Sequence, residues 1–322
     1  MKKITIILFL CLFAIFQNCN YCYAVPKNVI VTFFPLYIHT LNIAGDKLNV
    51  EILLPPGVGI HHFSAKPSDL KKIAAADIAI KNGAGLDDFV NKLIESSGNT
   101  KITVTDASEG IETIKGQSSC SECSHSHTNV TNPNEDKNGH ADKHSHASEA
   151  AGDPHTWISV KNAIKQTENI LNSLIKCDPS NAEYYKKNAA EYTAKLKELD
   201  KYTEEKLKNF KGRKFIVYHG PFAYFAKDYG LEQHSIAGIT GTAPAPSKLK
   251  EIYGTIQNDK IKFLVSEPAY RDREIKAISE ELKLFVTELD PVETYSKKED
   301  FKNYFIDRMK ENADKLSEAF NR

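Results

Sequence analysis

Short apolar runs alternate with amphipathic stretches along the first half of the chain. The runs combine β-branched and other apolar residues, which favours strands, and helical spacing of the apolar positions at residues 66–75 and 86–94 predicts helices between them. Regular alternation of this kind is typical of a mostly parallel sheet with helices on both faces. The strands are expected at residues 28–34, 49–54, 78–80 and 102–105.

The same pattern restarts beyond residue 212, although the two halves share no sequence repeat. Strands are expected at residues 214–218, 233–236, 261–265 and 284–287, and helices at residues 221–228, 247–257, 274–282 and 298–320. We therefore predict an α/β protein of two similar lobes, each a mostly parallel four-stranded sheet with flanking helices.

A long helical pattern joins the two halves and follows a helix expected at residues 160–175. Asp178 can cap the long helix, Pro179 fits its first position, and no Gly or Pro interrupts it to about residue 210. At about 1.5 Å per residue it would span roughly 45 Å, enough to link two lobes. A short coiled coil is the alternative. The apolar stripe comprises Tyr185, Ala189, Tyr192, Leu196 and Leu199.

These patterns divide the chain into four parts. The predicted boundaries are a leader at residues 1–24, a first lobe at 25–177 that includes a polar insert at 116–152, a linking helix at 178–211 and a second lobe at 212–322.

The leader has the features of a secretory signal peptide. Lys2 and Lys3 precede an apolar run at residues 4–16, and small Ala24 offers a cleavage site. The run of about 13 residues is shorter than the roughly 20 that a membrane-spanning helix needs. No later stretch is long enough either, so we expect an exported, periplasmic protein without membrane insertion once the leader is cleaved.

The residues around the leader's cysteines do not match a lipoprotein signal. Asn18 precedes Cys19 and Tyr21 precedes Cys22, where such a signal has small residues. Loss of the leader also removes two lysines from a chain with 42 basic and 42 acidic residues. The slight negative charge that remains argues against nucleic acid or an anionic membrane as partner. We expect a free, monomeric protein.

Histidines gather in the polar insert at residues 116–152, which has no apolar stretch to bury. Such a composition predicts a mobile segment. Because neutral imidazole is a common zinc ligand, we interpret the insert as an auxiliary metal-collecting loop, with a plain polar linker as the alternative. Cys120 and Cys123 either belong to this metal-collecting loop or form a small disulfide with each other, and Cys177 is then left unpaired. The loop histidines are His125, His127, His140, His144 and His146.

Further histidines and carboxylates follow the predicted strands or, for His155, the insert. Binding groups in open α/β sheets lie just past the carboxyl ends of strands, so these side chains are candidates for one shared site. Spacing alone does not choose between His61 and its neighbour His62, and the carboxylate of Glu267 is either an acceptor that orients an imidazole or a substitute ligand. The candidates are His61, His62, His155, His219, Glu267 and Asp290.

Two residues from each lobe would place an ion between the lobes. Three imidazoles, from His61, His155 and His219, together with the Asp290 carboxylate satisfy a four-coordinate zinc ion. The same set can hold Mn²⁺ or Fe²⁺ if the carboxylate binds through both oxygens.

Several motifs, spread over nearly the whole mature chain, carry a family resemblance. The most specific are LLPPGVGIHHFSAKPSD at residues 53–69, DPHTW at 153–157 and VYHGPFAYFAKDYGL at 217–231, with SEPAY at 266–270 and LDP at 289–291 in support. The sequence resembles the cluster A-I metal-binding proteins of ABC importers, in particular the zinc-type ZnuA group of this TroA-like family.

The resemblance implies a function and a ligand set. It implies an extracytoplasmic, high-affinity zinc-binding component that delivers Zn²⁺ to a membrane permease, and a rigid linking helix that limits lobe motion. The motif alignment assigns the first ligand to His61 rather than His62, and the next two to His155 and His219. Asp290 matches the carboxylate ligand of manganese-type relatives, whereas the fourth position varies in zinc-type ones. The second-lobe disulfide common in zinc-type members is missing, because no cysteine follows Cys177.

Two alternatives remain at the level of sequence. One is a manganese- or iron-type member of the same family. The other is a secreted zinc hydrolase with three protein ligands, a bound water and Glu267 as general base. The chain has no His-Glu-x-x-His motif and no nucleophile elbow, and four protein ligands would leave no open coordination position. We therefore expect a binding protein and not an enzyme.

Overall fold

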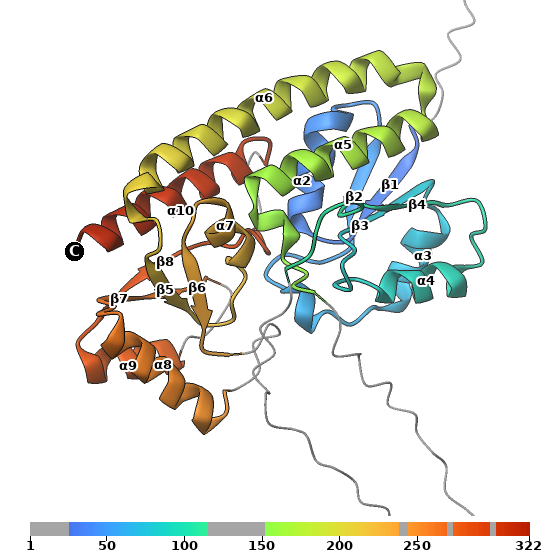
Figure 1. The fold of residues 1–322 in the computed structure, drawn as a ribbon. Coiled ribbons are helices and arrows are strands. Elements are labelled where there is room, and N and C mark those ends of the chain that lie inside the picture. Colours follow the sequence, from blue (N-terminus) through green and yellow to red (C-terminus); the bar gives the residue numbers. More distant parts are fainter. Residues whose placement is uncertain (1–25, 115–151, 238–243, 269–272, 297–300) are drawn as a thin grey trace, which may run out of the picture.

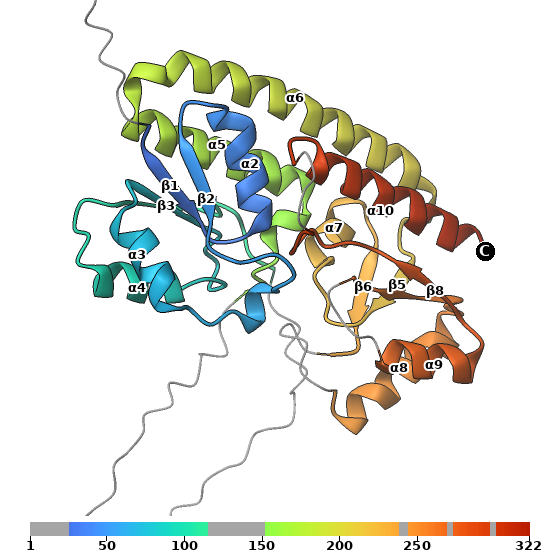
Figure 2. The same cartoon turned by 180° about the vertical axis from the view of Figure 1, so that it is seen from behind.

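The computed structural model describes residues 26–114, 152–237, 244–268, 273–296 and 301–322. The predicted signal peptide, the loop histidines and Cys120 and Cys123 lie outside these residues. The described parts form two lobes side by side beneath a long helix (Figure 1), and the view from behind shows the same two lobes (Figure 2). In this part of the chain, no helix is both long and apolar enough to cross a bilayer.

Each lobe contains one four-stranded parallel sheet. The first has the order β2-β1-β3-β4 and the second β6-β5-β7-β8, so both lobes use the same arrangement of strands along the chain. This confirms the predicted fold class. The strands are β1 (Asn28–Val31), β2 (Asn49–Ile52), β3 (Ile78–Lys81), β4 (Thr103–Asp106), β5 (Lys214–Val217), β6 (Glu232–Ser235), β7 (Phe263–Ser266) and β8 (Phe285–Glu288).

Helices cover both faces of each sheet because alternate strand residues point to opposite sides. In β1, Val29 and Val31 join the large core beneath the long helices, whereas Ile30 packs toward α3 and α4. In β5, Phe215 joins the large core and Ile216 packs toward α8 and α9. The helices are α2 (Phe34–Ala44), α3 (Pro67–Ala74), α4 (Phe89–Ser97), α5 (Val160–Cys177), α6 (Ala182–Leu207), α7 (Ala223–Asp228), α8 (Pro246–Asn258), α9 (Arg273–Leu282) and α10 (Tyr304–Asn321).

Helix α2 was not predicted: its first residue, Phe34, was placed at the end of a strand expected at residues 28–34, and residues 35–44 were assigned to no element. The strand ends at Val31, and α2 begins at Phe34 with a proline in its first turn. Phe34, Leu36 and Ile38 are all buried. A helix that is apolar on most sides has no clear amphipathic period, so these residues did not give the spacing that predicts a helix.

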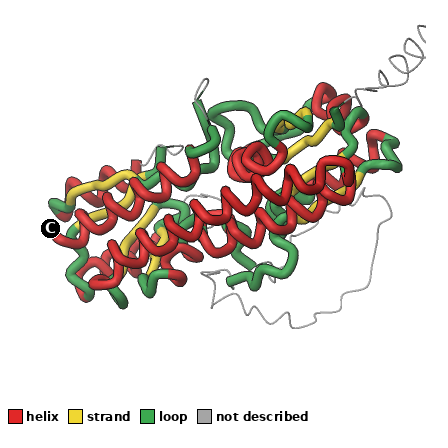
Figure 3. Tube along the Cα trace, turned by 90° about the horizontal axis from the view of Figure 1, so that it is seen from above, coloured by secondary structure: helices red, strands yellow, loops and turns green. Residues whose placement is uncertain are grey.

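The linking helix begins slightly later than predicted. Residues Pro179–Asn181 form a 3₁₀ turn, and the Asp178 carboxylate accepts hydrogen bonds from Ser180 and Asn181 before α6 starts. Its predicted apolar stripe is buried along its whole length. Seen from above, α10 lies along α6 (Figure 3). The first turn of α10 also contacts the first lobe, since the Tyr304 ring packs on Phe34 at 5.0 Å between centroids.

Cys177 ends α5 as a free thiol within the described residues. It lies half-buried against the large core. Burial raises the pKa of this thiol, which makes it less reactive than an exposed cysteine.

Candidate metal centre

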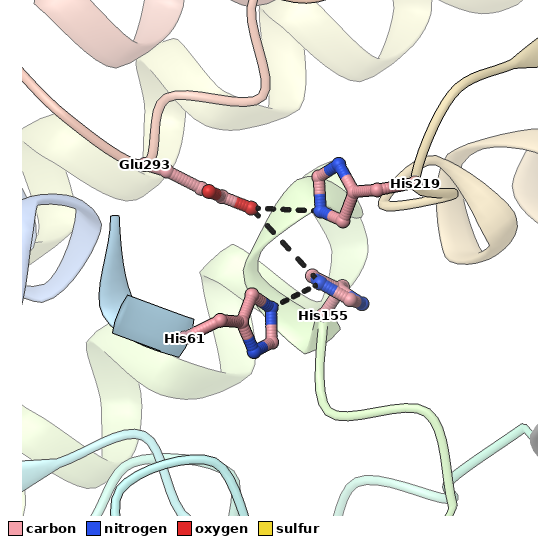
Figure 4. A group of neighbouring side chains, drawn as sticks. All are labelled: His61, His155, His219 and Glu293. Carbon is pink, nitrogen blue, oxygen red and sulfur yellow. Dashed lines mark hydrogen bonds and ion pairs between the residues drawn. The ribbon is translucent and has the colours of Figure 1, made fainter. Parts of the chain in front are cut away.

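Four side chains from both lobes converge on one point between the lobes. His61 lies on a 3₁₀ turn after β2, and His155 immediately precedes the 3₁₀ turn that leads into α5. His219 follows β5, and Glu293 follows β8. One potential ligand atom from each side chain lies within 4.8 Å of the other three (Figure 4). The structure thus brings the three predicted histidines together with a carboxylate that was not predicted.

The spacing of these atoms fits a small tetrahedral ion. His61 Nε2 lies 3.1 Å from His155 Nε2, and His219 Nε2 lies 3.2 Å from Glu293 Oε1. The same carboxylate oxygen is 4.0 Å from His155 Nε2. Zinc bonds of about 2.0–2.1 Å in tetrahedral geometry place neighbouring ligand atoms about 3.3 Å apart. Shifts of a few tenths of an ångström for the two closest pairs, and larger shifts for the wider ones, would complete the coordination.

Carboxylates behind two of the imidazoles set their orientation. Asp153 Oδ1 lies 2.7 Å from His155 Nδ1 and also accepts the His155 backbone N–H. Glu267 Oε2 lies 2.5 Å from His219 Nδ1. When a carboxylate holds Nδ1, Nε2 is left free to face an ion, and the basicity of the ring increases. Of the two roles considered for Glu267, this geometry fits an acceptor that orients His219.

Asp290, predicted as the carboxylate ligand, lies outside this group. Its Oδ1 accepts the backbone N–H of Val292 at 2.8 Å, and its Oδ2 lies 4.0 Å from Arg308 Nε. Asn312 on α10 binds both the backbone N–H and the backbone carbonyl of Asp290. Asp290 therefore shapes the turn after β8, and the carboxylate that reaches the histidines comes three residues later, from Glu293.

The turn reaches this position through an unusual backbone conformation. Val292 is buried and has φ of 59°, in the left-handed region that β-branched residues avoid. The Nε1 group of Trp157, in the first lobe, donates to the Pro291 carbonyl at 2.9 Å and holds the turn from the other side. The sequence predicted a ligand directly after the strand, at Asp290. The only available signal for Glu293 was that it is the next acidic residue after Asp-Pro.

His62, the other candidate next to His61, shares the 3₁₀ turn after β2. The position of its side chain lies outside the part of the structure that is described. The choice of His61 over His62 therefore rests on the sequence motif and on the convergence of His61 with the other three side chains.

The site is buried and carries opposing charges. The side chains of His155, His219 and Glu293 are all fully buried. Burial alone would lower the pKa of His219, but the Glu267 and Glu293 carboxylates outweigh it and raise that pKa to about 10. Burial also opposes ionisation of Glu293, but His219 and the other two imidazoles hold its pKa below its usual range. A metal ion must therefore displace a proton from His219 when it binds.

Glu293 Oε2 supplies a further indication that a cation belongs here. It is fully buried and has no hydrogen-bond donor among the described residues. A buried carboxylate oxygen without a donor is costly, whereas a bound cation would satisfy it. The donor set therefore fits a divalent ion coordinated by three imidazole nitrogens and one carboxylate.

A model of one protein family matches most of the chain. The family is described as zinc-uptake complex component A, periplasmic, and the match covers residues 29–319.

Relatives of known name show the same similarity. The chain is 32% identical over 294 residues to the high-affinity zinc uptake system protein ZnuA of Bacillus subtilis, covering 91% of this chain and 87% of that protein. It is 30% identical over 302 residues to the zinc-binding lipoprotein AdcA of Streptococcus pneumoniae, covering 93% of this chain. The match spans 57% of that AdcA, so AdcA is much longer than this chain.

Solved structures share the fold. A crystal structure of ZnuA superposes with a TM-score of 0.74 at 23% identity, covering 91% of this chain and 99% of that one. The AdcAII protein of Streptococcus pneumoniae gives a TM-score of 0.75, also at 23% identity, with 91% and 98% of the two chains covered. At this level of identity the likeness concerns the fold.

Proposed function

We infer a function from the premise that this chain belongs to the ZnuA family, the periplasmic A components of zinc-uptake complexes. The protein is the extracytoplasmic zinc-binding component of an ABC-type importer, and Zn²⁺ is its cargo rather than a resident cofactor. The observation that carries this function is the convergence of three imidazoles and one carboxylate on a buried point between two lobes.

We assign the cargo site to His61, His155, His219 and Glu293. The donor set, three nitrogens and one oxygen at tetrahedral spacing, suits zinc. Manganese prefers more oxygen ligands and ranks last in affinity among these divalent ions, so the site favours zinc over a manganese or iron cargo. The four ligands also fill a tetrahedral coordination shell, which leaves no position for the water molecule that a hydrolase requires.

A role in an ABC importer implies a membrane partner and an extracytoplasmic location for the protein. We propose that the protein is a monomer that hands Zn²⁺ to a membrane permease, and that it is released outside the inner membrane after cleavage of residues 1–24. Because AdcA of Streptococcus pneumoniae is named a lipoprotein, this release requires its own test. Detergent phase partitioning of the exported protein should place it in the aqueous phase, whereas recovery in the detergent phase would indicate a lipid anchor.

The His-rich insert adds an auxiliary role. We propose that its histidines collect metal ions weakly near the main site, since imidazoles at such spacing bind zinc without a defined fold. The insert is then dispensable for tight binding.

A chelator-competition titration with Zn²⁺ and Mn²⁺ tests these assignments. We would compare residues 25–322 with the same protein lacking residues 119–148, and with His155→Ala and His219→Ala. His234→Ala is the matched control, because His234 is a half-buried histidine on β6 whose imidazole faces Glu232. We expect one tight zinc site that survives the deletion and the control, and a loss of affinity of about 100-fold or more in the two ligand variants.

Other results would change the conclusion in distinct ways. Unchanged zinc affinity in both His155→Ala and His219→Ala would overturn the site. If deleting the insert abolished tight binding, the protein would be a metal buffer. A preference for Mn²⁺ would keep the architecture and change the cargo.

A further inference from the structure

The hydroxyl of Tyr224 joins the second lobe to both ends of the insert. Tyr224 lies on α7 and is almost fully buried. Its Oη donates a hydrogen bond to the Asp153 carbonyl at 2.6 Å and accepts one from the Ile114 backbone N–H at 3.1 Å. Ile114 and Asp153 also bond to each other, since the Asp153 N–H donates to the Ile114 carbonyl at 2.8 Å. One side chain therefore holds two segments of the first lobe together.

These bonds lie two residues from a metal ligand. The backbone of Asp153 is held by Tyr224, and its carboxylate holds His155 through Nδ1 and the backbone N–H. The next carbonyl, of Pro154, accepts a hydrogen bond from Asn82 at 3.0 Å. The loop is thus fixed on both sides, by a polar network within the first lobe and by Tyr224 from the second.

Helix α7 contacts the same loop region at a second point. Asp228, at its last turn, accepts a hydrogen bond from Ser159, which caps the start of α5. Figure 1 shows α7 beside the start of α5. The segment that carries His155 therefore runs between two contacts with α7, and Tyr224 makes the contact nearer to the ligand.

We propose that Tyr224 is a positioning residue for zinc binding: its hydroxyl fixes Asp153, which orients His155 toward the ion. The inference rests on the proposed function. A displacement of the Asp153 backbone moves the carboxylate that holds His155 Nδ1, and a rotated imidazole no longer presents Nε2 at coordination distance. Loss of the hydroxyl then increases the rate at which zinc leaves, because the bound geometry is held less firmly.

Tyr224→Phe tests this directly, because it removes the hydroxyl and keeps the buried ring. Tyr229→Phe is the matched control: Tyr229 lies directly after α7, is also buried, and donates to Asp200 at 2.9 Å, away from the loop. We would measure the zinc dissociation rate by rapid mixing with excess chelator, and the thermal unfolding temperature of the metal-free proteins. We expect a roughly tenfold faster dissociation in Tyr224→Phe and a rate within twofold of wild type in Tyr229→Phe.

A second background separates positioning from a general loss of stability. If Tyr224 acts through Asp153, adding Tyr224→Phe to the Asp153→Asn variant should alter the zinc dissociation rate of that variant by less than about twofold, because the orienting carboxylate is already gone. A tenfold effect in both backgrounds would overturn the proposed route. Equal rates in Tyr224→Phe and wild type, or equal changes in Tyr224→Phe and Tyr229→Phe, would overturn the positioning role. If wild type itself bound zinc only weakly, the proposed function would fail together with this inference.

Discussion

Replacing the two neighbouring carboxylates, Glu293 and Asp290, one at a time separates their roles. Glu293→Gln removes the negative charge of a fully buried side chain, one of four whose ligand atoms all lie within 4.8 Å of one another. Asp290→Asn keeps an oxygen that can accept the Val292 N–H, the bond that shapes the turn. We expect the first change to weaken zinc binding strongly and the second to leave it nearly unchanged.

The size of the first effect follows from the number of ligands. Structural zinc sites bind with about 10–16 kcal/mol at pH 7, or roughly 3 kcal/mol for each of four ligands. Since about 1.4 kcal/mol corresponds to a tenfold change, loss of one ligand should weaken binding by about 100-fold. Glutamine retains a neutral oxygen, so the loss should not be much larger. For Asp290→Asn we expect a change of at most about threefold.

The charge of Glu293 also acts on His219. Because this carboxylate helps to raise the pKa of His219, Glu293→Gln lowers that pKa and reduces the competition between protons and zinc. The affinity of the variant should therefore depend less on pH than that of wild type, and the deficit should be larger at pH 8.5 than at pH 7.

The assay is competition with a chromophoric chelator at several pH values, with circular dichroism to confirm folding. Wild-type affinity in Glu293→Gln, or an equal loss in Asp290→Asn, would refute the reasoning that the turn delivers Glu293 and not Asp290 to the ion.

Three further predictions follow from the structure. Zinc affinity of the wild type should rise about tenfold per pH unit between pH 7 and 9, because His219, with its pKa near 10, must lose a proton on binding; calorimetry in buffers of different ionisation heat would show one proton released, and release of none would contradict it. Burial lowers the pKa of His39 to about 3, so below about pH 6.5 the unfolded chain binds a proton that the folded chain does not. His39 therefore costs up to about 1.4 kcal/mol of stability per pH unit as the pH falls from 6.5 toward 3. Urea unfolding of His39→Asn should show a shallower decline of stability over this range, and an equal decline would mean that the folded protein can protonate this imidazole. Leu196→Ala on α6 should lower the unfolding free energy by about 2–5 kcal/mol, and exposed Lys197→Ala by less than about 0.5 kcal/mol; equal effects would mean that α6 is not packed as described.

The sequence predicted the fold well because its signals were local. Strand residues such as Val29 and Ile216 stand in short apolar runs between turns, and each of the eight predicted strands has a counterpart in the structure. Helix α2 was not predicted because a helix that is buried on nearly all sides has no amphipathic period. The helix was missed because the spacing of its apolar residues is uninformative, and not because its residues disfavour a helix.

The three histidines of the proposed site could be predicted from the sequence because each lies within a distinctive motif. Glu293 was not, because its position depends on tertiary contacts. Val292 adopts its left-handed conformation where Trp157 and Asn312, from distant parts of the chain, hold the turn. No local pattern in the sequence encodes those contacts. The fourth proposed ligand could therefore be identified only in the folded structure.

The bond between Ile114 and Asp153 has a consequence for how this protein can change over time. Because the backbones of Ile114 and Asp153 are bonded to each other, the closure entropy of the chain between them should grow only logarithmically with its length, by about 0.6 kcal/mol for each doubling. Insertions or deletions between these residues would cost little stability and would leave the ligands in place. We therefore expect this point in the chain to tolerate wide variation in length and composition, and it is a suitable site for inserting a reporter domain.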